Sequence, residues 1–271
     1  MILVSGVNHL AAAAFDRIAS SYDELFTDTA VGRAQRRQVW TRLLEAFPPG
    51  SRILELNCGT GGDARFLASR GRSVLACDAS RAMIQVAQQR HRGNNTRNAE
   101  YRVVANEDLG FLLGEKCFDG AFSNFSGFNC VADLATVAAS LAKLVKPGGR
   151  VLVCVWSRTC VTEMLWYLLR GEFKKAARRL STSSEVTLGG LAISVYYPGV
   201  PEIRASFAPW FQLLSRRAIG LFVPPSYVEQ WVNTRPHLLA RLERFDEWSA
   251  AWPILRDLGD HVLLEFERCS P

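Results

Sequence analysis

The sequence predicts an α/β fold: a mostly parallel sheet of seven strands covered by helices on both faces. In the first 158 residues, short apolar runs with strand character alternate with helical segments, a pattern typical of right-handed βαβ units. Two more strand-like runs follow near the C-terminus, and we expect the last one to run antiparallel. The seven runs are Arg52–Leu56, Ser73–Cys77, Tyr101–Ala105, Phe118–Ser123, Arg150–Trp156, Phe211–Ile219 and His261–Glu267.

Helical periodicity fills the stretches between these runs. Pro48-Pro49-Gly50 is expected to end the helix before the first strand, and Ser80 is a suitable N-cap for a later one. The predicted helices are Leu10–Ser20, Val31–Phe47, Gly61–Ser69, Arg81–His91 and Val131–Val145.

Composition indicates a soluble globular protein. The chain has 271 residues, of which 48% are hydrophobic and 21% charged, and a net charge of +6. Its seven cysteines form no CxxC pair, so we expect reduced thiols, no metal site and a cytoplasmic location. Neither a signal peptide nor a membrane span is expected. The basic stretch 170–179 resembles a solvated helix face more than a nucleic-acid-binding strip.

We expect one domain, residues 1–271, with three parts. Residues 1–47 would form a helical cap, 48–158 a cofactor-binding core, and 159–271 a helical lid over the substrate, interleaved with the last two strands. Aromatic side chains are dense in the third part and suit an apolar chamber for a small molecule. They are Trp166, Tyr167, Phe173, Trp231, Phe245, Trp248 and Trp252.

A glycine-rich loop, residues 55–63, follows the first strand and precedes a helix. Glycines there let the backbone approach a ligand and adopt positive φ. Asp78 ends the next strand, where its carboxylate can accept hydrogen bonds from two ribose hydroxyls. Ala64 at the third glycine position leaves a dinucleotide possible. Glu55 favours a cationic ammonium over a pyrophosphate, and so favours S-adenosylmethionine over a nicotinamide dinucleotide.

The segments ILELNCGTGGD and LACDAS resemble motifs I and II of class I S-adenosylmethionine-dependent methyltransferases. The upstream FDRIASSYDELF resembles the N-terminal segment of the small-molecule group related to quinone-biosynthesis methyltransferases. FDGAFSNFSGFNCVADL and LVKPGGRVLVCVWSR are further matches at the fourth and fifth strands. The resemblance covers roughly residues 15–158. It implies a Rossmann-like fold and transfer of a methyl group from S-adenosylmethionine, which leaves S-adenosylhomocysteine.

The resemblance also implies roles for single residues. Glu55 would organise the ammonium, Asp78 the ribose hydroxyls and Tyr22 the carboxylate, while Ala79 and Met83 would pack on the adenine. Gly59 and Gly61 would let the backbone approach, and Ser123, Asn124 and Phe125 would lie beside the methionine moiety. The full implied cofactor-binding set is Tyr22, Glu55, Asn57, Gly59, Thr60, Gly61, Asp78, Ala79, Met83, Asn106, Glu107, Asp108, Ser123, Asn124 and Phe125.

The chain departs from the family pattern at two positions. Asn57 stands where many relatives have glycine, and asparagine tolerates left-handed geometry. Ala105 stands where relatives often have an aspartate that bonds the adenine amino group. Asn106, Glu107 or Asp108 would substitute for it, and the sequence does not choose among them.

No catalytic residue is assigned from the sequence. His9 and His237 could reach the substrate as general bases, whereas His91 and His261 are interpreted as structural. We expect the acceptor to be an O, N or C atom of a small, apolar or aromatic molecule. The alternatives are an RNA or protein methyltransferase, or a non-catalytic S-adenosylmethionine-binding partner protein. The oligomeric state is left open.

Overall fold

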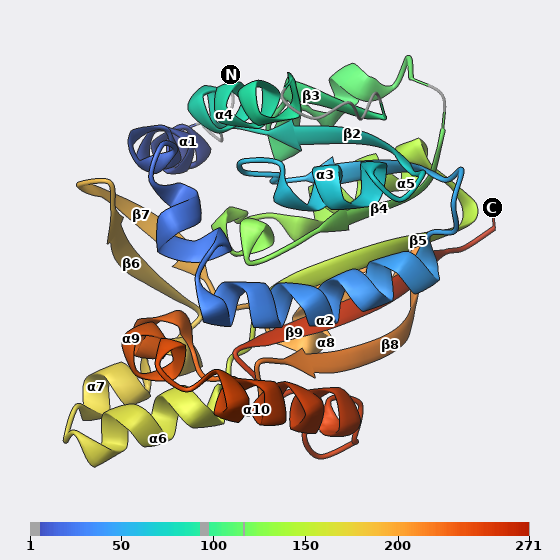
Figure 1. Cartoon of the computed structure of the whole chain (residues 1–271). Coiled ribbons are helices and arrows are strands. Elements are labelled where there is room, and N and C mark those ends of the chain that lie inside the picture. The colour runs from blue at the N-terminus through green and yellow to red at the C-terminus, as the bar shows by residue number, and fades with distance from the viewer. Residues whose placement is uncertain (1–5, 93–97, 116, 271) are drawn as a thin grey trace.

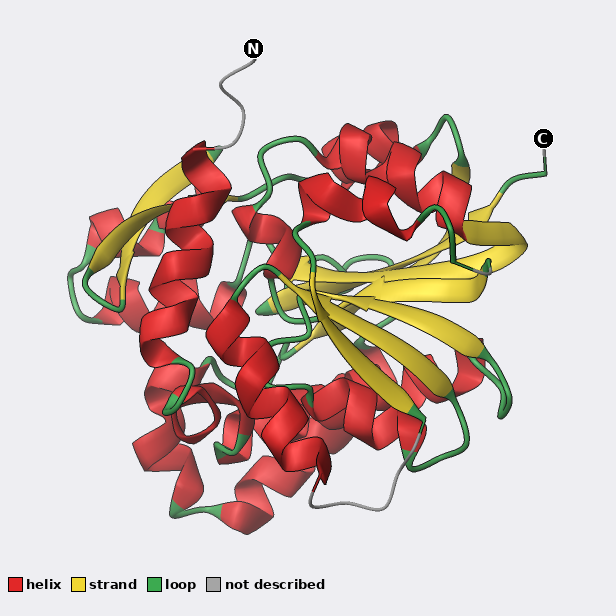
Figure 2. Cartoon of the chain, turned by 90° about the horizontal axis from the view of Figure 1, so that it is seen from above, coloured by secondary structure: helices red, strands yellow, loops and turns green. Residues whose placement is uncertain are grey.

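The computed structural model describes residues 6–92, 98–115 and 117–270, and a seven-stranded sheet lies at its centre (Figures 1 and 2). The strand order is β3-β2-β1-β4-β5-β9-β8. The first five of these strands are parallel, and β9 is antiparallel to both of its neighbours. This confirms the predicted sheet and its antiparallel last strand. The bounds are β1 Arg52–Leu56, β2 Ser73–Asp78, β3 Ala99–Val103, β4 Phe118–Ser123, β5 Val145–Trp156, β8 Phe211–Ile219 and β9 His261–Arg268.

Helices cover both faces of the sheet (Figure 2). Successive residues of β1 pack into opposite layers. Ile53 belongs to the apolar cluster that includes Leu43 of α2, while Leu54 belongs to the cluster that includes Leu141 of α5. A strand that is buried on both faces is therefore composed mostly of apolar residues. The α-helices are α1 Gly6–Ile18, α2 Ala30–Ala46, α3 Gly62–Ala68, α4 Arg81–Arg92, α5 Leu134–Leu144, α6 Val161–Leu169, α7 Phe173–Ala176, α8 Val200–Phe207, α9 Glu229–Asn233 and α10 Pro236–Ser249.

Several helices and strands begin or end at other residues than predicted. The helix expected over 131–145 begins at Leu134, because the Asp133 carboxylate accepts hydrogen bonds from the first backbone N–H groups. Strand β5 begins at Val145 and not at Arg150, so it includes the segment Pro147-Gly148-Gly149 that precedes the predicted strand. The pairing of β4 with β5 shifts register at this point, between Phe118 and Gly120, and a bulge accommodates the extra residues.

A β-hairpin lies beside the main sheet, in a region that the sequence analysis assigned to a helical lid. Strands β6 (Ser183–Leu188) and β7 (Leu191–Tyr196) pair antiparallel through a turn at Gly189-Gly190, where both glycines have positive φ. This turn chemistry is that of tight hairpins. The hairpin packs on α1, so two segments that are far apart in the chain lie side by side (Figure 1).

The C-terminal helices α6, α7, α9 and α10 gather on one side of the molecule, and the aromatic residues on them are mostly exposed. Trp248, for example, is 64% exposed, and Phe173, Trp231, Phe245 and Trp252 are also on the surface. The expectation that these side chains wall a chamber is therefore wrong for these five. Within the described residues, no helix combines the length and apolarity that a bilayer crossing requires.

Candidate functional site

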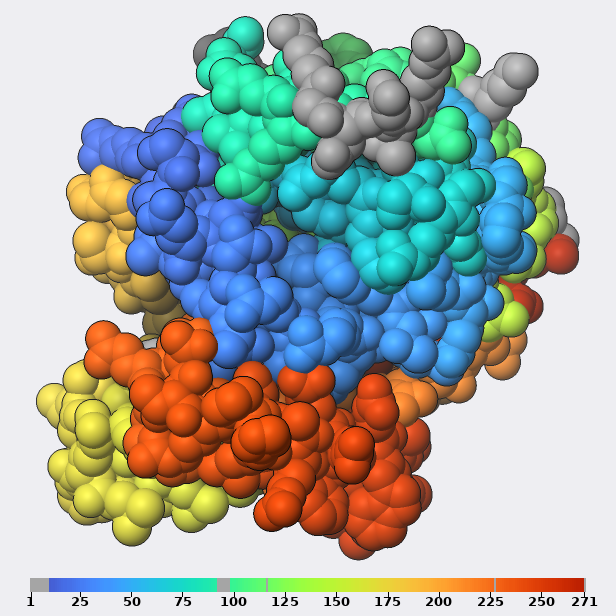
Figure 3. Space-filling view, in the orientation of Figure 1, coloured from blue at the N-terminus to red at the C-terminus, as the bar shows by residue number. Residues whose placement is uncertain are grey.

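A cavity of about 510 Å³ opens at the carboxyl ends of the parallel strands, where ligands bind in open α/β sheets. Its walls come from the N-terminal segment, the glycine loop, the β6–β7 hairpin and the start of β9. Figure 3 shows the N-terminal residues (blue) lying between the core (cyan to green) and the C-terminal helices (orange to red). Predicted site residues that line the cavity are Tyr22, Asn57, Gly59, Thr60, Asp78, Ala79, Met83, Asn106, Glu107, Asn124 and Phe125.

Four predicted residues are not among those lining the cavity: Glu55, Gly61, Asp108 and Ser123. Ser123 is buried and donates a hydrogen bond to Asn57 Oδ1 at 3.0 Å, so it supports the loop from behind. Asp108 is exposed. Of the three residues left open for the adenine amino group, the geometry therefore retains Asn106 and Glu107.

The glycine loop uses left-handed backbone at three positions: Asn57 (φ 56°), Gly59 (φ 53°) and Gly61 (φ 74°). The prediction that Asn57 preserves the turn is confirmed. At Gly61 a Cβ atom would lie 2.5 Å from the ring of Tyr101. Gly61 is therefore required by the close packing beneath the loop, as well as by the approach of a ligand.

Asp78 joins two loops at the cavity edge. Its carboxylate accepts hydrogen bonds from the backbone N–H groups of Gly59 and Ser80, both at 2.8 Å. Burial raises the pKa of Asp78, and these two hydrogen bonds oppose the rise. Ser80 Oγ accepts the N–H of Met83 at 3.1 Å, which confirms the predicted N-cap. A carboxylate offers about four acceptor sites, so acceptor capacity remains for a ligand.

Asp63 and Arg36 form a polar cluster at the cavity wall that sequence reasoning did not single out as binding residues. Asp63, in the first turn of α3, accepts hydrogen bonds from Arg36 and Trp40 of α2, both at 2.6 Å, and from Asn124 at 2.9 Å. These partners lie 23 to 61 residues away in the sequence. No local motif could therefore have revealed the cluster.

Glu55 lies buried behind this cluster and is only 1% exposed. Its Oε2 atom has no hydrogen-bond partner within the described structure. Burial and the neighbouring Asp63 carboxylate raise the pKa of Glu55 well above its usual range. Glu55 thus lies behind the wall, and Asp63 is the carboxylate that reaches the cavity.

The N-terminal segment is fastened to the glycine loop by a buried side chain. Thr60 Oγ1 donates a hydrogen bond to Asp23 Oδ1 at 2.5 Å, and Arg90 forms an ion pair with the same carboxylate. The ring of Tyr22 lies against Gly59, and its centroid is 5.2 Å from that of Phe26. Helix α1 ends at Ile18 and Leu25 is 52% exposed, so the helical spacing of apolar residues from Phe15 to Leu25 does not correspond to one continuous buried face.

The histidines are placed differently from expectation. The side chain of His9 lies outside the described residues, and His237 is exposed on α10 and is not a cavity-lining residue. His91 packs its ring on Tyr101. His261, which was interpreted as structural, lines the cavity together with Trp156, Phe125 and Tyr197.

The stretch 170–179 is not only a solvated face, because Arg179 is buried. Its guanidinium donates to Glu163 and Asp260 at 2.5 and 2.7 Å. Arg178 also binds Glu163, at 2.9 Å. Two of the basic groups of the stretch are therefore ion-paired, Arg179 inside the protein and Arg178 at its surface.

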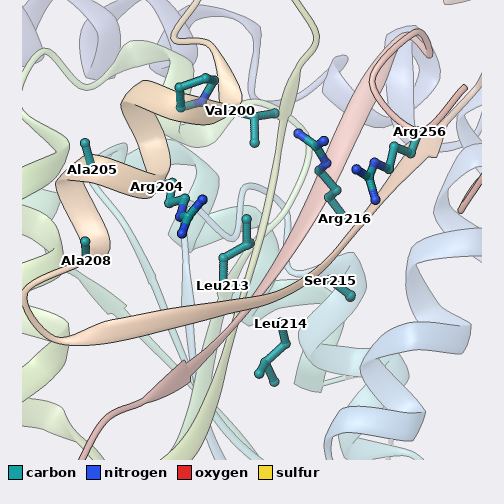
Figure 4. A pocket seen from close by; sticks show the side chains of 10 residues that line it. Val200, Arg204, Ala205, Ala208, Leu213, Leu214, Ser215, Arg216 and Arg256 are labelled. Carbon is teal, nitrogen blue, oxygen red and sulfur yellow. The ribbon is translucent and has the colours of Figure 1, made fainter. Parts of the chain in front are cut away.

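A second hollow of about 550 Å³ lies between α8 and the edge strand β8 (Figure 4). Arg204, Arg216 and Arg256 line it, and Arg216 is paired with Asp257 at 3.1 Å. None of the motif residues reaches this hollow. The candidate site is therefore the cavity at the carboxyl edge of the sheet.

Comparisons with known proteins identify the family of the chain. Residues 53–149 match a family model described as a methyltransferase domain. The chain is 33% identical over 147 residues to a demethylmenaquinone methyltransferase of Thermobifida fusca, covering 54% of this chain and 61% of that protein. It is 30% identical over 225 residues to the demethylmenaquinone methyltransferase of Streptomyces avermitilis, covering 78% of this chain and 90% of that protein.

Among solved structures, a DhpI–SAH complex superposes with a TM-score of 0.61 at 17% identity, covering 98% of both chains. That identity shows a shared fold. With the sequence relatives, it establishes that the chain belongs to the class I S-adenosylmethionine-dependent methyltransferases. The predicted family, fold class and cofactor are confirmed. The contacts of single residues with the cofactor stay predictions.

Proposed function

We propose that the protein transfers a methyl group to an O, N or C atom of a small, apolar or aromatic molecule. The observation that carries this proposal is the lining of the cavity beyond the glycine loop. Aromatic and aliphatic side chains converge there from the N-terminal segment, the hairpin and the main sheet. They include Phe15, Phe26, Phe125, Trp156, Leu188, Ile193, Val195 and Tyr197. Such enclosure suits a small apolar ligand.

The described residues fit the cofactor at the polar end of the cavity. Asp63 offers a carboxylate at the wall for the ammonium, with Glu55 buried behind it, and Arg36 and Tyr22 lie at the same wall for the carboxylate of the cofactor. Asp78 has acceptor capacity for the ribose, while Ala79 and Met83 offer apolar surface for the adenine. S-adenosylmethionine supplies a methyl group on a positively charged sulfur, which is a good leaving group.

The chain's own contribution is positioning and exclusion of water. The Asp23–Thr60 contact holds the N-terminal segment against the glycine loop, and the Asp63–Arg36 contact holds α2 against the start of α3. A fixed, enclosed geometry can supply about 7–11 kcal/mol of the barrier reduction by orientation alone. Residues 1–47 and the segments after residue 158 would act as the cap and the lid over a core of residues 48–158.

Two observations weigh against a nucleic-acid or protein acceptor. Arg178 and Arg179, from the densest basic stretch, are engaged by Glu163 and Asp260. The two arginines that line the cavity, Arg178 and Arg179, are the same ion-paired groups, and the side chains around them are mostly aromatic or aliphatic. We include the absence of a nucleic-acid partner in the proposal, and a cytoplasmic location because all seven cysteines are free.

Methyl-labelled S-adenosylmethionine incubated with a cell extract tests the proposal. We expect label in the small-molecule fraction, and much less of it with the Asp78→Ala variant, whose cofactor binding should be weaker. Label in RNA or protein would replace the proposed acceptor by a macromolecule. Tight cofactor binding without any transfer would indicate a non-catalytic binding protein.

A further inference from the structure

His261 occupies the acceptor end of the cavity. It is the first residue of β9 and pairs with Trp156 at the end of β5 and with Ile219 at the end of β8. This antiparallel strand therefore starts at the carboxyl edge of the parallel strands, where the site lies. The His261 side chain is mostly buried, yet it lines the cavity.

Aromatic side chains fix the imidazole ring. Its centroid is 5.3 Å from that of Phe125, with the planes at 90°, and 6.3 Å from that of Trp156. His261 Nδ1 lies 3.3 Å from Asp260 Oδ2, but the two atoms do not have the geometry of a hydrogen bond. Catalytic contacts are often this long before the ligands bind. Nε2, the other ring nitrogen, makes no hydrogen bond within the part of the chain that the structure describes.

Asp260 is held in place on several sides. Arg179 donates to Asp260 Oδ1 at 2.7 Å and to its backbone oxygen at 2.8 Å, and Gln35 donates to Oδ2 at 3.2 Å. Burial alone would raise the pKa of Asp260, but the neighbouring imidazole and Arg179 outweigh burial and hold it well below its usual range. The group beside His261 Nδ1 is therefore a fixed carboxylate.

The charges around this dyad are balanced. Glu163 and Asp260 are the buried carboxylates, and Arg178 and Arg179 bind them. Their sum is zero before the imidazole gains a proton. A carboxylate in this position selects the tautomer with hydrogen on Nδ1 and stabilises the imidazolium once it forms, as in other histidine–aspartate pairs.

We infer that His261 is the general base for the methyl acceptor and that Asp260 is the positioning residue that orients it. This inference rests on the proposed function, because it assumes an acceptor that carries an O–H or N–H group or an ionisable aromatic ring. As the acceptor atom forms its bond to the methyl carbon, the carbon–sulfur bond breaks and its electron pair stays on sulfur. The acceptor proton passes to Nε2 of His261 and then to solvent.

Nitrogen-15 NMR of histidine-labelled protein tests the dyad without any acceptor. With S-adenosylhomocysteine bound in mildly alkaline buffer, we expect His261 to carry its hydrogen on Nδ1, with Nε2 unprotonated. Asp260→Asn should shift the population toward the Nε2–H tautomer. A wild-type His261 with hydrogen on Nε2, or a tautomer unchanged by Asp260→Asn, overturns the inference.

Kinetics test the chemical role, with 1,4-naphthohydroquinone and simple phenols as acceptor probes. His261→Gln should lower kcat about 10²–10⁴-fold, while its affinity for S-adenosylhomocysteine and its melting temperature stay near wild type. His237→Gln, at an exposed histidine outside the cavity, is the matched control and should retain wild-type kcat. A wild-type kcat for His261→Gln overturns the inference. If wild-type protein methylates no probe, the proposed acceptor class fails, and the NMR result still decides the dyad.

Discussion

Two carboxylates of this site, Asp78 and Glu55, differ in whether they have hydrogen-bond partners. Asp78 is satisfied on one side by backbone N–H groups, whereas Glu55 is buried with an unpartnered oxygen. Desolvation penalises both charges, but only Asp78 receives hydrogen bonds that compensate. Asp78 is therefore part of the folded scaffold even without ligand. Glu55 costs stability until a cation lies nearby.

Replacing Asp78 by alanine should weaken S-adenosylmethionine binding at least tenfold. The ribose hydroxyls would lose a charged acceptor, and such hydrogen bonds are worth about 1.5–3 kcal/mol each. Isothermal calorimetry measures the affinity. Asp16→Ala is the matched control, because Asp16 also caps the start of α4, through Ser80 and Ala82, but does not line the cavity. Unchanged affinity in a folded Asp78→Ala protein would refute the ribose assignment.

Glu55→Gln should stabilise the ligand-free protein while weakening cofactor binding. Because the folded-state pKa of Glu55 is raised, the folded protein holds more protons than the unfolded chain above about pH 4.5. Its free energy of unfolding therefore falls as pH rises through that range. The variant lacks this slope, so its advantage should grow from acid toward neutral pH, to about 1 kcal/mol or more. Urea unfolding at several pH values measures it, and a variant less stable at neutral pH would contradict the argument.

At the scale of elements, the strands of the main sheet were predictable because each is a short apolar run between turn residues. The β6–β7 hairpin was missed although residues 183–196 alternate around Gly189-Gly190, because dense aromatics nearby favoured a helical interpretation. The positions of Asp63, Arg36 and His261 in the lining of the cavity could not be predicted from the sequence. Arg36 and Asp63 meet across 27 residues, and His261 meets Trp156 only through pairing of the last strand.

The N-terminal segment, residues 15–26, should gain protection from hydrogen exchange when S-adenosylhomocysteine binds. Its main polar tie to the loop is Asp23, through Thr60 and Arg90, while Leu25 and Phe26 remain partly exposed. A ligand beneath Tyr22 would add contacts to this weakly anchored element. Helix α5, on the opposite face of the sheet, supplies an internal reference that should not change.

Asp23→Asn gives the complementary measurement, because it weakens the tie to the loop without altering the cavity wall. Protection of residues 15–26 should then fall in the free protein and be partly restored by ligand. Equal protection with and without ligand in the wild type would mean a permanently docked segment, with Tyr22 as a static contact.

Across the whole molecule, one cavity collects side chains from both ends of the chain and from the middle. Phe15 and Arg36 come before the first strand, Asp78 lies within the core, and Tyr197 and His261 follow it. The sheet thus serves as a frame on which segments distant in sequence close around one ligand. Binding should therefore stabilise the protein as a unit and not only the glycine loop.

Thermal unfolding measures this coupling. S-adenosylhomocysteine at about 100 times its Kd should add about 2.7 kcal/mol to the free energy of unfolding. For a chain of this size, that corresponds to a rise in Tm of about 5–10 °C. NAD at the same concentration should give no comparable shift, because the Asp63 and Asp78 carboxylates line the cavity beside the loop and disfavour a pyrophosphate there. Asp78→Ala should lose about half of the shift or more at that same ligand concentration. A larger shift with NAD than with S-adenosylhomocysteine would break the link between this cavity and methyl transfer.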